Sequence, residues 1–222
     1  MIRFPRAART TLTLALPLAL AALAAPSLSQ MPSTPPGTLD KSRVTAGNYT
    51  VDATHSMIAW RVNHLGFNDY FGLFGQLGGS MTFDPANPAA AKLTATIPVS
   101  KVVTVDQALT AHLLKPGADG GKADFFGANA ADAVFVSTKV IPGADGLSAT
   151  VEGNLTLNGV TKPAAFTAKF SGAGTNFFNK AATIGFHGES TIKRSDFGLG
   201  FFAPLVADEV KLEITIAFEK KG

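Results

Sequence analysis

The 222-residue chain has no cysteine, 17 phenylalanines beside one tryptophan and two tyrosines, and a charged fraction of only 16%. The lack of cysteine excludes a disulfide scaffold, a thiolate zinc site, a cysteine nucleophile and a lipoprotein cysteine. Arg3, Arg6 and Arg9 account for the whole formal charge of +3, so the rest of the chain is balanced and nucleic acid is not expected as a partner.

Residues 1–25 are predicted to be a signal peptide. They combine three arginines with an apolar run, Leu12–Ala25, that Pro17 interrupts, and 22–24 supply the small-x-small cleavage pattern. The alternative is a membrane anchor, but the run gives only about 21 Å of helix against a hydrocarbon core of ~30 Å. Export is therefore expected. Residues 26–46, rich in Pro, Ser and Thr, predict a disordered linker.

From residue 47 onward, apolar and polar residues alternate with the period of two that is typical of β-strands. Asn158-Gly159 predicts a tight hairpin, because both residues accept a positive φ. The predicted strands lie at 48–64, 70–84, 93–99, 134–140, 147–157, 164–170, 184–192 and 210–218. Sequential antiparallel strands favour a β-sandwich or an up-and-down barrel. An eight-stranded barrel either fills with side chains or holds one small ligand.

One stretch, Val103 to Asp132, does not alternate and is rich in Ala, Gly and Asp. Within it, residues 106–115 place apolar side chains at helical spacing. The sequence therefore predicts a helix and a loop inserted between the third and fourth strands.

The sequence lacks the common patterns of catalytic and metal sites. Its histidines, at 55, 64, 112 and 187, have no metal-helix spacing and are interpreted as hydrogen-bonded structural residues rather than metal ligands or acid–base groups. The loop Gly117–Lys122 fails the phosphate-binding pattern because Ala123 stands where Ser or Thr is required. No catalytic residue, metal or cofactor is predicted.

Aromatic residues share the predicted strand faces with glycine and alanine, which leaves room for a cavity walled by aromatic rings. Most of these rings would be core residues in any fold. The candidate ligand-binding residues are apolar side chains spread over the whole domain: Trp60, Phe67, Phe71, Phe74, Phe83, Phe126, Phe135, Phe166, Phe170, Ile184, Phe186, Leu212 and Ile214.

Several longer motifs are spread over about residues 48–219. They are Tyr49-x-x-Asp52-x-x-His55-Ser56, Val62-x-His64-Leu65-Gly66-Phe67, Gly72-x-Phe74, Met81-x-Phe83-Asp84, Ala111-His112-Leu113-Leu114, Asp124-Phe125-Phe126, Phe135-x-Ser137-Thr138, the run 153–163, Lys193-Arg194-Ser195-Asp196-Phe197-Gly198 and Val206-x-Asp208-Glu209-Val210. Together these motifs resemble the YceI family. The resemblance implies an extended, lipocalin-like, eight-stranded antiparallel barrel in residues 47–222. It also implies a polyisoprenoid or isoprenoid-quinone-like lipid inside the barrel, a periplasmic location and, for some members, a homodimer.

Two features depart from the family pattern. Ala111 stands where an Asp is usual before His-Leu, and the loop Lys115–Lys122 is longer. Both lie near the expected mouth of the pocket, so they bear on the preferred head group.

Three functions remain open from the sequence. The first is an exported lipid carrier or store without catalysis. The second is an enzyme that acts on a lipid or quinone at the barrel mouth through His55, His64 or Arg194. The third is a stress protein that binds amphiphiles without specificity. Binding predicts stoichiometric lipid and no product, whereas catalysis predicts a product and a pH profile near the histidine pKa.

Overall fold

The computed structural model describes residues 31–221. The chain divides into two units, Met1–Thr34 and Pro35–Gly222, and all described strands belong to the second. The predicted signal peptide, residues 1–25, lies outside the described residues. Among residues 31–221, no helix has the length and apolar character needed to cross a bilayer.

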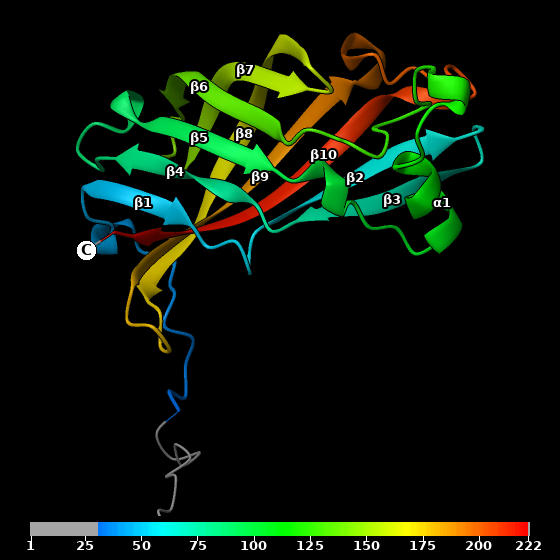
Figure 1. The fold of residues 1–222 in the computed structure, drawn as a ribbon. Helices are drawn as coiled ribbons and strands as arrows, with labels where there is room; N and C mark the ends of the chain where they lie inside the picture. Colours follow the sequence, from blue (N-terminus) through cyan, green and yellow to red (C-terminus); the bar gives the residue numbers. More distant parts are fainter. Residues whose placement is uncertain (1–30, 222) are drawn as a thin grey trace, which may run out of the picture. The chain divides into compact units, whose positions relative to one another are not determined.

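One antiparallel sheet of ten strands makes up the domain (Figure 1). The strands are β1 Gly47–Val51, β2 Met57–His64, β3 Asn68–Gly75, β4 Gly78–Phe83, β5 Lys92–Ile97, β6 Ala133–Pro142, β7 Ser148–Leu157, β8 Val160–Thr175, β9 Ala182–Lys193 and β10 Val206–Lys220. The helices are α1 Gln107–Leu113 and the 3-10 turns η2 Lys41–Arg43, η3 Pro88–Ala90, η4 Val99–Lys101, η5 Ala118–Gly120 and η6 Arg194–Phe197.

The sheet closes on itself as an eight-stranded barrel. β10 pairs with β1 through 218–220 and with β2 through 206–215, so β1 and β2 act as one interrupted strand. β3 pairs with β2, and β4 pairs with β1, so β3 and β4 form a second interrupted strand. This confirms the eight predicted strands and the barrel, and it excludes the sandwich. The hairpin at Asn158-Gly159 is confirmed by positive φ angles of 51° and 76°.

The breaks in the first two strands have local causes. Asp52 folds the chain into a turn, because its carboxylate accepts hydrogen bonds from Thr54 and contacts His55 at 2.7 Å. Ser56, almost fully buried, then accepts a hydrogen bond from the Ala217 N–H at 3.0 Å and fixes this turn to β10. Gln76, at a φ of 57°, separates β3 from β4. The barrel therefore has two halves, one built on β1 and β4 and the other on β2 and β3.

The half built on β1 and β4 is filled by a hydrophobic core. Tyr49, Leu77, Ile184 and Phe218 are each no more than 2% exposed. The Phe186 ring packs edge-on against Phe218 at 6.2 Å between centroids. The interior of this end of the barrel is therefore occupied by packed side chains.

Part of the predicted linker is ordered, which differs from the expectation of disorder through residue 46. Thr38 exchanges two backbone hydrogen bonds with Ala173, at 3.1 and 2.9 Å. Asp40 caps η2 by accepting from the Ser42 N–H, and Val44 is buried in the barrel core. The Pro and Ser content did not indicate this order, because the order comes from contacts with β8 and not from the composition of the segment.

Candidate ligand-binding cavity

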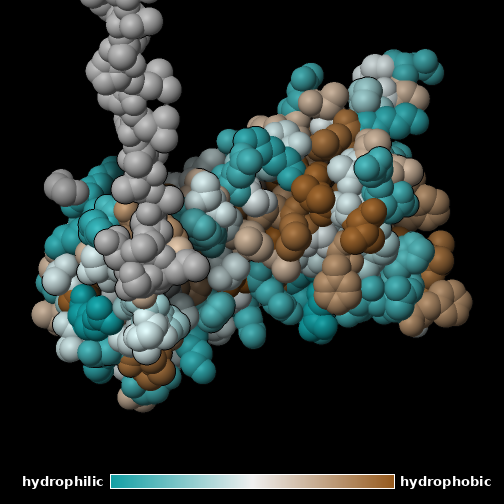
Figure 2. Space-filling model, turned by 90° about the horizontal axis from the view of Figure 1, so that it is seen from below, coloured by the Kyte–Doolittle hydropathy of each residue, from teal (hydrophilic) through white to brown (hydrophobic). Residues whose placement is uncertain are grey.

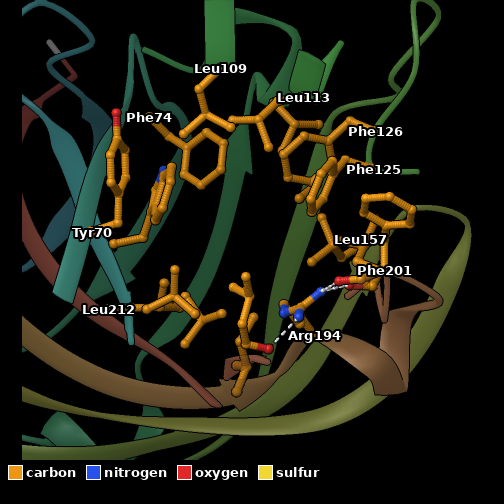
Figure 3. Close-up of a pocket in the computed structure, with 18 of the residues that line it drawn as sticks. Tyr70, Phe74, Leu109, Leu113, Phe125, Phe126, Leu157, Arg194, Phe201 and Leu212 are labelled. Atoms are coloured by element: carbon orange, nitrogen blue, oxygen red, sulfur yellow. Dashed lines mark hydrogen bonds between the residues drawn. The ribbon is translucent and has the colours of Figure 1, made fainter. Parts of the chain in front are cut away.

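A cavity of about 530 Å³ occupies the half of the barrel built on β2 and β3 (Figure 3). The rest of its wall comes from α1, the end of β5, the start of β6, the ends of β7 and β9, the start of β10 and the loops next to them. Most of the lining side chains are apolar. Apart from the Trp60 indole, the lining groups with polar atoms are His64, Tyr70, Asp106, His112 and Arg194.

The alternation of β2 and β3 directs their apolar residues into this cavity. Ile58, Trp60 and Val62 alternate along β2, and β3 pairs Tyr70 opposite Val62 and Phe74 opposite Ile58. Residues directly opposite on an antiparallel pair share a face, so these side chains form one continuous wall.

α1 covers another part of the cavity and packs against the wall formed by β2 and β3. Leu109 and Leu113 are four residues apart and therefore lie on one face of the helix, where both line the cavity. The helix begins at Asp106, whose carboxylate accepts from the Ala108 N–H at 2.8 Å. Helix capping thus positions two aliphatic side chains over β3.

Aromatic rings connect these walls. Phe74 lies 6.4 Å from Trp60 and 6.0 Å from Phe126, measured between ring centroids. At the mouth, Phe125 lies 5.6 Å from Phe201, and His112 packs edge-on against both. The lining therefore offers aromatic surfaces to an apolar ligand.

Arg194 has a structural role beside the cavity. It is 7% exposed, and its guanidinium donates to the carbonyls of Ala207 at 2.9 Å, Phe201 at 2.8 Å and Val206 at 2.7 Å, and to that of Leu199 (Figure 3). These bonds hold the loop between η6 and β10. Four hydrogen bonds to the protein backbone leave little capacity for a ligand.

Asp208 fixes the same loop from its other side. Its carboxylate accepts from the Ser195 N–H at 2.8 Å and from the Ser195 hydroxyl at 2.7 Å. Partial burial raises the pKa of Asp208, but the Ser195 bonds and the charges of Arg194 and Lys193 outweigh it and hold the pKa below its usual value. Burial lowers the pKa of Arg194, while Asp208 opposes this shift.

The depressed pKa of Asp208 predicts a pH-dependent stability. A carboxylate with a lowered folded-state pKa stabilises the fold fully above its unfolded value of 3.8 and loses this contribution as the pH falls through the folded value. Asp208→Asn should therefore cost about 1 kcal/mol near neutral pH, allowing for partial exposure. Urea titrations of both proteins should show this gap closing below about pH 4. A gap that persists in acid would contradict the assignment.

Gly72 on β3 sets the position of Trp60, because a Cβ at residue 72 would overlap the indole ring. Gly72→Ala should lower the free energy of unfolding by about 1–3 kcal/mol through overpacking. It should also shift the fluorescence of Trp60, the one tryptophan of the chain. Gly75→Ala is the matched control, since nothing lies within 4 Å of its Cβ position. Equal effects of the two variants would contradict this assignment.

The predicted ligand-binding residues fall into three groups. Trp60, Phe74, Phe126 and Leu212 line the cavity. Phe67 and Phe71 do not, since they are 86% and 56% exposed on the outside of the barrel. The others face the interior but lie away from the cavity, mostly in the packed half: Phe83, Phe135, Phe166, Phe170, Ile184, Phe186 and Ile214.

Several lining residues were not among the candidates. Leu109 and Leu113 had a usable signal in their helical spacing, and Phe125 and Phe201 each adjoin another phenylalanine in sequence. Tyr70 and Val62 face each other on the two strands that build the hollow half, and each shares the alternating face of a predicted residue, Phe74 and Trp60 respectively.

The histidines have different surroundings. The His55 side chain is 74% exposed, contacts Asp52 and does not line the cavity. His112 is engaged by Asp124 at 2.9 Å, and His64 lies at the mouth. Within residues 31–221, no group of three or more His, Cys, Asp or Glu side chains could hold a metal ion.

A closed eight-stranded antiparallel barrel, packed at one end and hollow and apolar at the other, defines a lipocalin-like barrel with a cavity suited to small apolar ligands. Residues 49–218 match the protein-family model described as the YceI-like domain. The chain belongs to the YceI family, as the sequence motifs indicated.

Relatives and solved structures support this membership. A UPF0312 protein of Pseudomonas paraeruginosa is 37% identical over 175 residues, covering 77% of this chain and 86% of the relative. A UPF0312 protein of Yersinia pestis is 35% identical over 173 residues, covering 77% and 85%.

Among solved structures, BcnA of Burkholderia cenocepacia superposes with a TM-score of 0.63 at 27% identity, covering 75% of this chain and 98% of BcnA. The YceI protein of Campylobacter jejuni gives 0.59 at 28% identity, covering 72% and 90%. A polyisoprenoid-binding domain from Saccharophagus degradans shares the fold, with a TM-score of 0.53 at 15% identity over 78% of this chain and 98% of that domain.

Proposed function

We propose that this protein binds the long apolar chain of a polyisoprenoid lipid in its cavity and carries or stores it without turnover. The observation that supports this most directly is an apolar cavity of about 530 Å³ beside a fully packed barrel end. Pockets of roughly 300–1,000 Å³ hold drug-sized groups, so a longer chain would extend through the mouth. The related domain from Saccharophagus degradans is described as polyisoprenoid-binding.

The energetics favour such a ligand. Each five-carbon isoprene unit gains roughly 3–4 kcal/mol on full burial, at about 0.8 kcal/mol per carbon. Two or three buried units would give sub-micromolar binding after the costs of association. The cavity therefore need not enclose the whole chain to hold it.

The lining supports a neutral head group of the isoprenoid-quinone type. Arg194 is the one Lys or Arg among the lining residues, and its guanidinium is occupied by backbone carbonyls. Asp106 adds a negative charge at the wall. A prenyl phosphate would therefore lack a cationic partner here, whereas a quinone requires none. We expect a prenylquinone to bind more tightly than the prenyl phosphate of equal chain length.

The features of residues 1–25 support a periplasmic carrier. Three arginines, an apolar run and a small-x-small pattern are typical of an export signal. Lipids with long apolar chains aggregate in water, so moving them through an aqueous compartment requires a soluble container. Periplasmic fractionation, with mass spectrometry of the mature N-terminus, tests the location.

Binding is favoured over an enzyme or a non-specific amphiphile binder. Of the candidate acid–base residues, His55 does not line the cavity, and Arg194, which lines it together with His64, is held by backbone carbonyls. A cavity with a defined aromatic wall also selects for shape. Incubation with a prenylquinone should leave the lipid unchanged, and a new product would overturn this choice.

A homodimer is proposed on the outer face of β3. Apolar side chains stand exposed there and on the adjoining segment: Phe71, Leu73, Val103 and Val105. Figure 2 views the molecule from the side on which β3 lies in Figure 1, and it shows apolar side chains gathered on one part of that face. Exposed apolar patches of this kind mark association surfaces. Sedimentation should show a dimer that Phe71→Arg dissociates.

Native mass spectrometry with solvent extraction, on protein purified from its own host, tests the lipid-binding proposal. One prenyl lipid per barrel is the expected result, with its mass identifying the chain length and head group. A clean apo mass together with no uptake of added prenylquinone would overturn the proposal.

A further inference from the structure

Four large apolar side chains, here called the apolar rim, stand exposed beside the cavity mouth. Leu65 and Phe67 belong to the turn between β2 and β3, and Phe202 and Leu205 belong to the loop between η6 and β10. Their exposed fractions are 45%, 86%, 58% and 60%. The Leu65 N–H donates to the Leu205 carbonyl at 2.9 Å, so the two loops lie side by side and form one surface.

The apolar rim is continuous with the cavity. Phe202 itself lines the cavity, and its ring centroid is 4.5 Å from that of Phe201, which also lines it. On the other loop, His64 lines the cavity immediately before Leu65. An apolar chain could pass from the rim to the cavity without crossing a charged group of these two loops.

The backbone holds two of these apolar residues in an unfavourable conformation. Leu65 and Phe202 have φ angles of 57° and 59°. The other non-glycine residues with positive φ in the described part of the chain are all polar: Gln76, Asp119, Asn158 and Lys180. Turns prefer Asn, Asp or Gly at such positions, and neither Leu65 nor Phe202 is a buried core residue. Apolar residues at these sites point to a role outside the folded core.

The charge pattern fits an apolar environment. Neither segment, 64–68 or 199–206, contains Asp, Glu, Lys or Arg. Both can therefore leave water without desolvating a permanent charge. Just behind the second loop, the Lys122 ammonium donates to the Gly198 carbonyl at 2.9 Å. A lysine at that level can face lipid phosphates while the loop tips lie deeper.

We propose that the apolar rim docks onto the surface of a lipid bilayer and opens the cavity directly to the membrane. This rests on the proposed function, because the cargo of such a cavity dissolves in bilayers and not in water. A bilayer supplies both an apolar medium for uncharged loop tips and the lipid that enters between them. The rim shares no residue with the exposed face of β3, so docking and dimer formation use separate surfaces.

The test compares wild type with Phe67→Ser/Leu205→Ser, since neither residue lines the cavity. The matched control is Phe178→Ser, at 85% exposure in the turn between β8 and β9, at the end of β9 away from the cavity. Each protein is sedimented with vesicles of phosphatidylcholine and with vesicles of phosphatidylethanolamine and phosphatidylglycerol in equal parts. Uptake of a long-chain ubiquinone from these vesicles, and binding of a short-chain ubiquinone dispersed in buffer, are measured in parallel.

In the double variant, the affinity for vesicles and the rate of ubiquinone uptake from them should both fall about tenfold or more. The loss should be seen with both vesicle types. The variant's affinity for dispersed ubiquinone and its circular dichroism should equal those of wild type, and Phe178→Ser should behave as wild type throughout. Wild-type vesicle binding by the double variant would overturn the docking proposal. A double variant that changes only the oligomeric state would also overturn the docking proposal. Rim-dependent vesicle binding without any ubiquinone uptake would support docking and overturn the proposed cargo instead.

Discussion

Arg194→Met is expected to lower the free energy of unfolding by about 3–5 kcal/mol, the largest stability loss of any single substitution considered for this barrel. Arg194 is 7% exposed, and its guanidinium donates to four backbone carbonyls of the loop between η6 and β10 and of the start of β10. Methionine matches much of the apolar stem but leaves these carbonyls without donors. The measurement is urea unfolding followed by circular dichroism.

Two comparisons separate hydrogen bonding from charge. Arg194→Lys keeps the charge but lacks the planar fork, so it should recover less than half of the loss. Hydrogen exchange should show the faster exchange concentrated in residues 199–207, the segment that Arg194 holds. A loss below about 1 kcal/mol for Arg194→Met would contradict the structural role, and it would return Arg194 to the candidates for ligand contact.

The barrel could be predicted from the sequence because its information is local. In a strand with one face toward the interior, apolar and polar residues alternate, and this alternation is visible in the sequence. The dipeptide Asn158-Gly159 specifies a tight hairpin turn through two positive φ angles. The inserted helix could also be predicted from the sequence, since Leu109 and Leu113 repeat at helical spacing. What the period did not reveal is that β1 and β2, predicted as one strand, are divided at Asp52 by a side-chain turn.

The position of the cavity could not be predicted in the same way. Phe74 and Phe186 look alike in sequence, as apolar aromatic residues on inward faces. Phe186 packs against Phe170 and Phe218 on the neighbouring strands β8 and β10, inside the filled core, whereas Phe74 packs against Trp60 on the neighbouring strand β2 and against Phe126 beside the cavity. Whether an inward side chain is covered depends on its distance from the opposite strand, and this is a property of the whole barrel.

Apolar residues in the loops were the hardest to place from the sequence. Phe67 is a phenylalanine like any other in the sequence, and it was grouped with the interior aromatic residues. Its place at a hairpin tip, at 86% exposure, follows from the Leu65-Gly66 turn, where two positive φ angles reverse the chain. Turns usually prefer polar residues or glycine, so an exposed phenylalanine at this position is unusual. A functional role accounts for it better than packing does.

Val210→Trp is expected to weaken prenylquinone binding by about 100-fold or more while the barrel stays folded. Val210 lies on β10 opposite Val62, both side chains line the cavity, and both remain partly exposed to it. A tryptophan at this position would occupy the space of about one isoprene unit. Losing roughly 3 kcal/mol of apolar burial corresponds to about two powers of ten in the dissociation constant.

Lys211→Trp is the matched control, because it places the same side chain on the outer face of the same strand. Both variants should retain the circular dichroism of the wild type, since Val210→Trp extends into the cavity and leaves the backbone pairing of β10 with β2 in place. Tight binding by Val210→Trp would mean that the ligand lies elsewhere, and the exposed face of β3 would then be the surface to test. Equal loss in both variants would indicate a general effect of the added indole. Only a loss confined to the inward position places the lipid inside the barrel, because only that substitution removes space from the cavity.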